Sequence, residues 1–339
     1  MQTYFHSSRD FPHEKLKAHF RLIRDTPCNN SELAYSVLIP RQWQGESVCT
    51  GSEFPNPNTL MPLRIFKGPE DGVLIRIHAI RLVREITAAN WLRHHAIETE
   101  RKILAISPIS DNSADCLTEF VNKEHVFQCR AAAFIDGDRL FFIQNLARSS
   151  AYPKYEEVFG VPVMSFDISK QSGKPSVEKH IPYNSDAIVR FAYPASWKCR
   201  AAAEKRPGEK GDVDLFSIGS DGNVSGRMRI KTVEKSFSKD NEARILETIA
   251  EYRDHNVIAG GILETVEAAI ATSRFDSALV RAYRTQIRND EIGQEIWIAV
   301  IEDPKYHIII SMLTPFREQA FFLWAVNRRA YGIILESLS

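Results

Sequence analysis

The stretch Glu295–Leu313, which reads EIWIAVIEDPKYHIIISML, decides how the rest of the chain is interpreted. It contains two apolar runs of strand length, joined by the turn residues Asp303–Lys305. A third apolar run, Leu279–Ile287, precedes it, and apolar side chains then recur at helical spacing as far as Leu338. The end of the chain therefore predicts an antiparallel meander followed by a long helix.

The same order of elements occurs earlier in the chain. An apolar strand is followed by Pro-x-x-Trp at Pro40 and Trp43, and again at Pro194 and Trp197. In both places a hairpin, a helix, a meander and a second helix follow. Proline ends a strand because it lacks an N–H group, and tryptophan is large enough to cover the open end of a small core. We therefore predict a duplicated α+β unit: two tandem domains, each with an antiparallel sheet flanked by helices.

Composition indicates where the two copies meet. Residues 171–186 are rich in Ser, Gly, Pro and Lys, which is typical of a linker. We expect an N-terminal extension over 1–30, a first domain over 31–170, the linker over 171–186 and a second domain over 187–339.

Two local predictions concern the first half of the chain. Apolar side chains at helical spacing favour a short helix over His13–Arg24, which either packs on the first domain or docks a partner. A second helix is expected from Thr87, a good N-cap, to about Leu104, followed by a loop over Ser107–Ala114.

Overall composition limits the plausible functions. The chain has 339 residues, with 43 Lys and Arg against 43 Asp and Glu, and a hydrophobic content of 44%. A balanced charge argues against a general nucleic-acid binder, which needs a basic surplus to neutralise phosphates. No stretch approaches the roughly 20 apolar residues that a transmembrane helix requires, so no such segment is expected. The sequence indicates no oligomeric state.

The cysteines and the N-terminus bear on the cellular compartment. The first 25 residues have charges throughout and no apolar core, so they do not resemble a secretory signal. Five cysteines without a CxxC pair are more typical of reduced thiols in a cytosolic protein than of a disulfide framework. We therefore expect a cytoplasmic protein with free thiols.

Three segments carry a resemblance to a known fold. Tyr35–Trp43 (YSVLIPRQW), Phe191–Trp197 (FAYPASW) and the closing block Ile296–Leu338 resemble the PsbP-like fold. This fold group includes the photosystem II extrinsic P subunit, Ran-binding Mog-type proteins, DcrB lipoproteins and the Eag chaperones of bacterial type VI secretion. The resemblance implies two tandem PsbP-like domains and a mostly non-catalytic role as adaptor, assembly factor or chaperone. It transfers no binding residue, because no family-specific position can be matched.

Few residues suggest chemistry. His94 and Glu98 lie four positions apart on the helix predicted after Thr87, a spacing that suits metal ligation. No third ligand is visible nearby, so a solvated helix face is the favoured interpretation and no metal is assigned. The chain has neither a phosphate-binding glycine loop nor a Gly-x-Ser-x-Gly elbow. We predict no catalytic residue and no cofactor, and the sequence favours a protein that is not an enzyme.

Charge alternates along one strand in each copy. Arg227, Arg229 and Lys231 alternate with apolar or neutral neighbours, so one strand face is basic. The equivalent strand of the first copy has Arg76 and His78 on one face. The simplest interpretation is a solvated sheet face, and the functional one is a surface for an acidic or mixed protein partner.

These observations lead to a functional prediction. We expect a protein-binding adaptor or chaperone, for example in the assembly of a bacterial secretion or envelope machine, as the fold resemblance implies. The alternative is an enzyme or small-ligand-binding protein with a site in the cleft between the domains.

Overall fold

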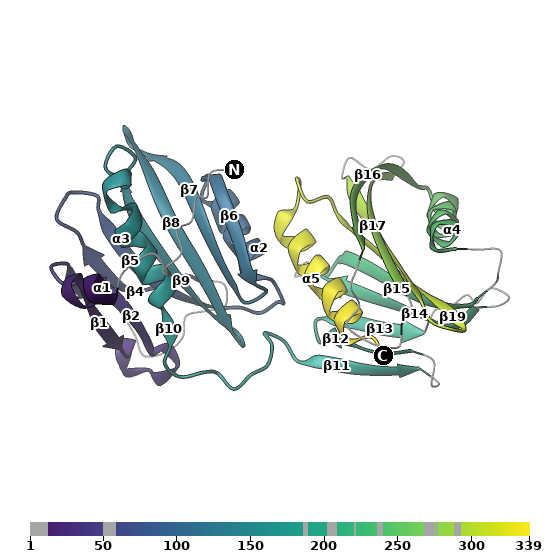
Figure 1. Cartoon of the computed structure of the whole chain (residues 1–339). Coiled ribbons are helices and arrows are strands. Elements are labelled where there is room, and N and C mark those ends of the chain that lie inside the picture. Colours follow the sequence, from purple (N-terminus) through teal and green to yellow (C-terminus); the bar gives the residue numbers. More distant parts are fainter. Residues whose placement is uncertain are drawn as a thin grey trace. The chain divides into compact units, whose positions relative to one another are not determined.

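The computed structural model describes residues 13–49, 59–185, 189–201, 209–219, 222–235, 240–267, 275, 277–287 and 293–339. The chain divides into two compact units, Met1–Val177 and Glu178–Ser339, and each contains one seven-stranded antiparallel sheet (Figure 1). Residues 1–12 of the predicted extension lie outside the described residues.

The first unit has a large sheet of order β3-β4-β5-β9-β8-β7-β6 and a small sheet of order β1-β2-β10. Its elements are α1 (His13–His19), β1 (Phe20–Asp25), η2 (Pro27–Asn29), η3 (Ser31–Leu33), β2 (Tyr35–Pro40), β3 (Gln44–Ser47), β4 (Met61–Lys67), β5 (Leu74–Arg81), α2 (Ala88–Glu98), β6 (Lys102–Ser110), β7 (Ser113–Asn122), β8 (His125–Asp136), β9 (Arg139–Arg148), α3 (Tyr152–Ser165) and β10 (Asp167–Ile168).

The second unit has a large sheet of order β13-β14-β15-β19-β18-β17-β16, beside the pair β11-β12. Its elements are β11 (His180–Ser185), β12 (Val189–Pro194), β13 (Trp197–Ala201), β14 (Glu209–Ile218), β15 (Val224–Glu234), α4 (Asn241–Asp254), β16 (Val257–Glu267), β17 (Ser277–Ile287), β18 (Gln294–Glu302), β19 (Tyr306–Pro315) and α5 (Phe321–Ser337). Within this unit α4 and α5 lie on opposite sides of the sheet (Figure 1).

The two large sheets have the same topology. Raising every strand number of the first sheet by ten gives the strand order of the second. In each sheet the central strands, β5 with β9 and β15 with β19, pair antiparallel. The predicted α+β fold and its tandem duplication are therefore confirmed by strand order and register.

The helix predicted over Thr87–Leu104 is correct at its start and wrong at its end. The Thr87 hydroxyl accepts a hydrogen bond from the Asn90 N–H at 3.3 Å, as an N-cap does. Glu100 then takes a left-handed conformation with φ of 52°, and such a conformation commonly ends a helix. Lys102–Ser110 forms the edge strand β6, paired with β7, where a helix end and a loop were expected. The meander of each unit therefore has four strands.

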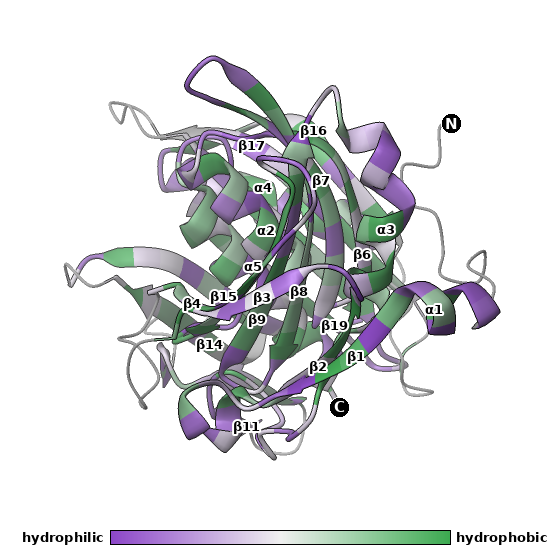
Figure 2. Cartoon of the chain, turned by 90° about the vertical axis from the view of Figure 1, so that its left-hand side faces the viewer, coloured by the Kyte–Doolittle hydropathy of each residue, from purple (hydrophilic) through white to green (hydrophobic). Residues whose placement is uncertain are grey.

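The helix predicted over His13–Arg24 is wrong beyond His19. Phe20–Asp25 forms β1, which pairs antiparallel with β2 from Phe20 opposite Pro40 to Asp25 opposite Tyr35. Tertiary pairing overrides the helical spacing here, because β2 has unpaired backbone groups that a second strand can satisfy. Within the predicted helix, only α1 is helical. It lies beside β1 and β2 and has both hydrophilic and hydrophobic residues (Figure 2).

The division between the units falls within the segment predicted as a linker. At the end of that segment His180–Ser185 forms β11, which pairs antiparallel with β12. The ends of the two domains that we assigned from the sequence stay proposals.

The tryptophans of the two Pro-x-x-Trp segments are buried. Trp43 is 5% exposed and contacts Tyr155 and Phe159 of α3 edge to face, with ring centroids 6.3 Å apart in both pairs. Trp197 is 2% exposed. In the first unit the tryptophan thus packs between the end of β2 and α3, as expected of a residue that closes a small core.

A buried carboxylate joins α5 to the sheet of the second unit. Glu295 on β18 is 0% exposed and accepts hydrogen bonds from the indole N–H groups of Trp297 and Trp324, at 3.0 and 2.9 Å. Arg317, which precedes α5, donates to the same carboxylate at 2.7 and 2.8 Å. The guanidinium of Arg317 also lies 4.6 Å from the ring centroid of Trp324. This network holds the start of α5 against β18.

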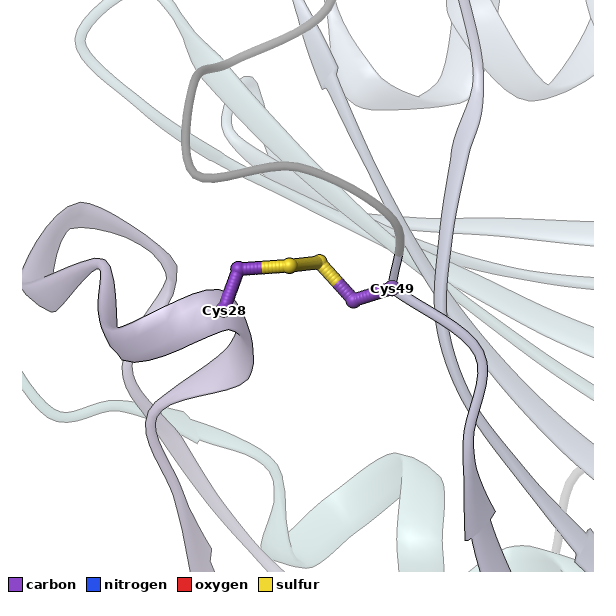
Figure 3. Close-up of a disulfide and its surroundings, with 2 residues drawn as sticks. All are labelled: Cys28 and Cys49. Carbon is purple, nitrogen blue, oxygen red and sulfur yellow. A yellow bond between two sulfur atoms is a disulfide. The ribbon is translucent and has the colours of Figure 1, made fainter.

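A disulfide corrects the expectation of reduced thiols. Cys28 in η2 and Cys49 after β3 are bonded, with Cα atoms 6.0 Å apart, a separation that suits a disulfide (Figure 3). The two cysteines are 21 positions apart, so spacing alone could not reveal that the fold brings them together. Cys116, Cys129 and Cys199 are free.

Candidate functional site

Strand β15 has an apolar face and a basic face. Met228 and Ile230 are 0% and 1% exposed. Arg227, Arg229 and Lys231 alternate with them and therefore point to the opposite face, towards α4. This is the alternation that the sequence predicted.

A small pocket of about 60 Å³ forms where the basic face meets the C-terminal end of α4. We call it the β15 pocket, and its lining residues are Arg227, Arg229, Lys231, Glu251, Tyr252, His255 and Ser311. The sequence revealed the first three. It could not reveal the other four, because they come from α4, its C-cap and β19. One signal was present: Ser311 is a polar residue in the apolar run of β19.

Two carboxylates partly balance the basic side chains. Arg227 and Arg229 lie 3.4 and 3.9 Å from the buried carboxylate of Asp214 on β14. Lys231 is ion-paired with Glu251 of α4. Among the residues that line the pocket, three are basic and one, Glu251, is acidic, so its lining is predominantly basic.

The three basic residues differ in accessibility. The side chain of Arg227 is 46% exposed and that of Arg229 is 22% exposed, whereas that of Lys231 is 5% exposed. Helix α4 thus covers part of the basic face, and the charged group of Lys231 is buried under it. A partner can reach Arg227 and Arg229.

The hydroxyl groups of the pocket are already bonded to each other. Tyr252 donates to the Ser311 hydroxyl at 3.0 Å. Burial raises the pKa of Tyr252, although this hydrogen bond and the nearby arginines oppose the rise. Tyr252 is therefore a neutral phenol, and it is unsuited to act as a base.

The corresponding positions of the first unit can be identified from the register. Gln144 and Ser311 each lie eight positions after the aspartates of the meander turns, Asp136 and Asp303. Arg76 pairs with Gln144 as Arg229 pairs with Ser311. The next residue on the same face is His78 in the first unit and Lys231 in the second.

The first unit has a neutral side chain, His78, at the position where the second has the cation Lys231. Burial and the neighbouring Arg76 lower the pKa of His78 to about 4, so this imidazole is neutral at pH 7. Its ring lies 6.0 Å from that of Phe142. Nitrogen atoms of three side chains here, Arg76 Nε, His78 Nδ1 and Gln144 Nε2, are buried without a hydrogen-bond partner among the described residues.

The suggested metal ligands gain no support. His94 Nδ1 lies 4.0 Å from Glu98 Oε1, as neighbours four positions apart on a helix do. Burial lowers the pKa of His94. In the described part of the chain, no group of three or more His, Cys, Asp or Glu residues is arranged to hold a metal ion.

None of the described helices has the length and apolarity that crossing a membrane requires.

Comparisons with known proteins identify similar folds. No protein-family model matches the sequence, and no curated protein matches it. Among solved structures the chain is similar to cyanobacterial PsbP from Synechocystis sp. PCC 6803, at 11% identity and a TM-score of 0.35, over 51% of this chain and 99% of that one. It is also similar to the T6SS immunity protein TplEi from Pseudomonas aeruginosa, solved in complex with the "L" peptide, at 7% identity and a TM-score of 0.24, over 94% of this chain and 97% of that one.

The first of these matches agrees with the PsbP-like assignment made from the sequence. At such TM-scores the matches carry no argument about function, so the functional argument rests on the sites themselves.

Proposed function

We propose that this chain is a non-catalytic adaptor or chaperone that binds another protein, and that an acidic side chain of the partner enters the β15 pocket. The observation that carries the proposal is the predominantly basic lining of the pocket, in which Arg227 and Arg229 are accessible. Arginine suits this role because its planar guanidinium can donate two parallel hydrogen bonds to one carboxylate.

The size of the pocket favours part of a larger partner. The volume of the β15 pocket is about 60 Å³. Pockets for whole small-molecule ligands typically have volumes of about 300–1,000 Å³. A carboxylate group fits the β15 pocket, and the remainder of the ligand lies outside it.

The chemistry of the pocket also favours binding over catalysis. Lys231 is paired with Glu251, and the Tyr252 hydroxyl is bonded to Ser311. A catalytic nucleophile needs an adjacent base that activates it, and these bonds engage Lys231 and Tyr252, two of the groups that could serve. The partner-binding role predicted for Arg76 and His78 in the first unit belongs to the same proposal.

The more specific parts of the prediction belong to the same proposal. A role in assembling a bacterial secretion or envelope machine follows from the fold resemblance. The cytoplasmic location expected from the sequence stays a proposal, and the disulfide between Cys28 and Cys49 removes the support that reduced thiols gave it. The alternative of an enzyme or small-ligand protein with a site between the domains stays a prediction.

Co-purification tests the proposal with the full chain. We expect wild-type protein to retain a stoichiometric protein partner, and Arg227→Gln/Arg229→Gln to weaken its affinity at least about tenfold, because both donors to the acidic group are lost. The matched control is Arg253→Gln, an exposed arginine of α4 outside the pocket, which should leave the affinity unchanged.

A second variant protects this test against misfolding. Arg227→Gln alone keeps Arg229 beside the buried Asp214, so it should preserve the fold and still weaken binding. Circular dichroism and thermal melting would verify both variants. Equal partner affinity in wild type and the folded double variant would refute the proposal.

A further inference from the structure

A larger pocket of about 460 Å³ lies in the first unit, where α1, the end of β2 and α3 meet. We call it the Trp43 pocket, after the tryptophan of the first Pro-x-x-Trp segment, and it is separate from the β15 pocket. Its floor is aromatic: Phe20, Trp43 and Tyr155 line it and are 4%, 5% and 5% exposed. Its volume falls in the range of pockets that hold whole small molecules.

The hydroxyl group of Tyr155 is hydrogen-bonded within the protein, so its aromatic ring is the part that a ligand would contact. Its hydroxyl donates to Glu70 Oε1 at 2.8 Å, and Glu70 is also paired with Lys154. The Tyr155 ring meets the Trp43 ring nearly edge to face, at 72° and 6.3 Å. Both rings therefore offer apolar surface to the pocket, fixed in orientation by their own contacts.

The rim of the Trp43 pocket is basic. Lys15 and Arg41 line it and are exposed, and none of its lining residues is an aspartate or glutamate. Within the described ranges, neither Lys15 nor Arg41 is paired with a carboxylate. A ligand that enters past this rim meets positive charge first and aromatic surface beneath it.

Arg41 also fixes one wall of the pocket. Its guanidinium donates to the Lys17 carbonyl through Nε and Nη2, at 3.3 and 2.9 Å. Its backbone N–H donates to the His19 carbonyl at 2.9 Å. These three bonds hold the end of α1 against the end of β2, so the pocket is formed before any ligand arrives.

We propose that the Trp43 pocket binds an amphipathic organic anion, a small molecule with one carboxylate or sulfonate group on an aromatic or aliphatic body. The acidic group lies between Lys15 and Arg41, and the body packs against Phe20, Trp43 and Tyr155. The inference does not depend on the proposed partner site, because the two pockets share no residue.

Two matched probes separate the charge of the ligand from its apolar body. 8-Anilinonaphthalene-1-sulfonate carries a sulfonate, and N-phenyl-1-naphthylamine has the same ring framework without it. Fluorescence titration of the full chain should show one saturable site for the sulfonate, with at least about tenfold weaker binding of the neutral amine. Equal affinity for the two probes would show a merely apolar surface and overturn the proposal.

Three variants locate the binding. Lys15→Gln removes one rim charge and should weaken sulfonate binding about fivefold while leaving the amine unaffected. Ala18→Phe fills the pocket from an exposed lining position and should abolish binding of both probes. Lys102→Gln, at an exposed lysine on β6 of the same unit, is the control and should change neither affinity.

The outcome with Ala18→Phe is decisive. This variant removes no charge and no core contact, so loss of folding is not expected, and a thermal melt verifies it. If folded Ala18→Phe binds the sulfonate as well as wild type does, the probe lies elsewhere and the assignment fails. It also fails if an acidic peptide binds at this site while the sulfonate does not.

Discussion

His78 and Lys231 occupy the same position in the two units and differ in charge at neutral pH. Each follows an arginine on the basic face of the central strand, Arg76 in one unit and Arg229 in the other. Lys231 carries a charge that Glu251 partners, whereas burial and Arg76 keep His78 neutral. At this position the strand face of the first unit is therefore neutral, whereas that of the second is positively charged.

The buried histidines of the first unit make its stability depend on pH. Burial is the main cause that lowers the pKa of both His78 and His95 to about 4. Below about pH 6.5 the unfolded chain binds protons that the folded chain does not bind. The stability from the neutral imidazoles is complete above pH 6.5 and is lost as the pH falls towards 4, by up to about 1.4 kcal/mol per pH unit for each histidine.

Denaturant unfolding at pH 7 and pH 5 would measure this loss. His78→Gln/His95→Gln should lose less stability than wild type between the two pH values, because glutamine does not titrate. The matched control is His125→Gln, at an exposed histidine on β8, and it should retain the wild-type dependence. An unchanged dependence in the double variant would exclude these two imidazoles as the cause.

Sequence patterns located part of the candidate site at the scale of single residues. The alternation in β15 identified Arg227, Arg229 and Lys231, because side chains at every second position of a strand share one face. Glu251 and Tyr252 were missed, since their approach to β15 depends on how α4 packs. The pattern also could not predict how exposed each of these side chains is, and Lys231 is buried.

The carboxylate of Glu295 fixes α5, an element at the end of the second unit. Its charge is buried and satisfied by Arg317, Trp297 and Trp324. Removing the charge leaves Arg317 with only the longer contact to Glu264, at 3.7 Å. We expect Glu295→Gln to lower the free energy of unfolding by about 2 kcal/mol, because three charge-assisted hydrogen-bond donors lose their anionic acceptor. Guanidinium titration, with fluorescence of the tryptophans beside α5, would measure the loss.

The contrast for this prediction is an exposed ion pair. Glu46 pairs with Lys67 at 3.0 Å, and both side chains are more than 60% exposed. Solvent screens such a pair, so Glu46→Gln should leave the free energy of unfolding almost unchanged. A loss in Glu295→Gln no greater than that in Glu46→Gln would show that the buried network contributes nothing to stability.

Helices and strands with strong patterns were predicted correctly, whereas some strands that depend on pairing with a neighbour were missed. The apolar runs that became β18 and β19, with the helix after them, were correct because their patterns are long and uninterrupted. The edge strand β6 and the strand β1 were missed. Both are strands because they pair with a neighbouring strand, and the local sequence pattern does not predict this pairing.

Duplication, a property of the whole molecule, was visible in the order of elements. It needed no residue identity between the copies, because the same sequence of hairpin, helix, meander and helix leads to the same strand order. The meeting of Cys28 and Cys49 was not visible, since it depends on how the segments around β2 and β3 fold back on each other.

Each compact unit should fold by itself. Each has its own large sheet and its own helices, and each has a size typical of independent domains. We expect separately produced Met1–Val177 and Glu178–Ser339 to unfold in single cooperative transitions when followed by circular dichroism. A half that is aggregated or unfolds without a transition would contradict this prediction and show that the duplicated units depend on each other.

The cross-link between η2 and the end of β3 makes the first unit sensitive to its chemical surroundings. Glutathione and thioredoxin systems keep most cytosolic thiols reduced, whereas an envelope or secreted environment preserves such bonds. A chain that remains in the cytosol would carry two extra thiols and no covalent link between Cys28 and Cys49. A chain that reaches an oxidising compartment would keep the bond between Cys28 and Cys49. Counting the cysteines that can be alkylated after extraction would show which environment the chain had occupied.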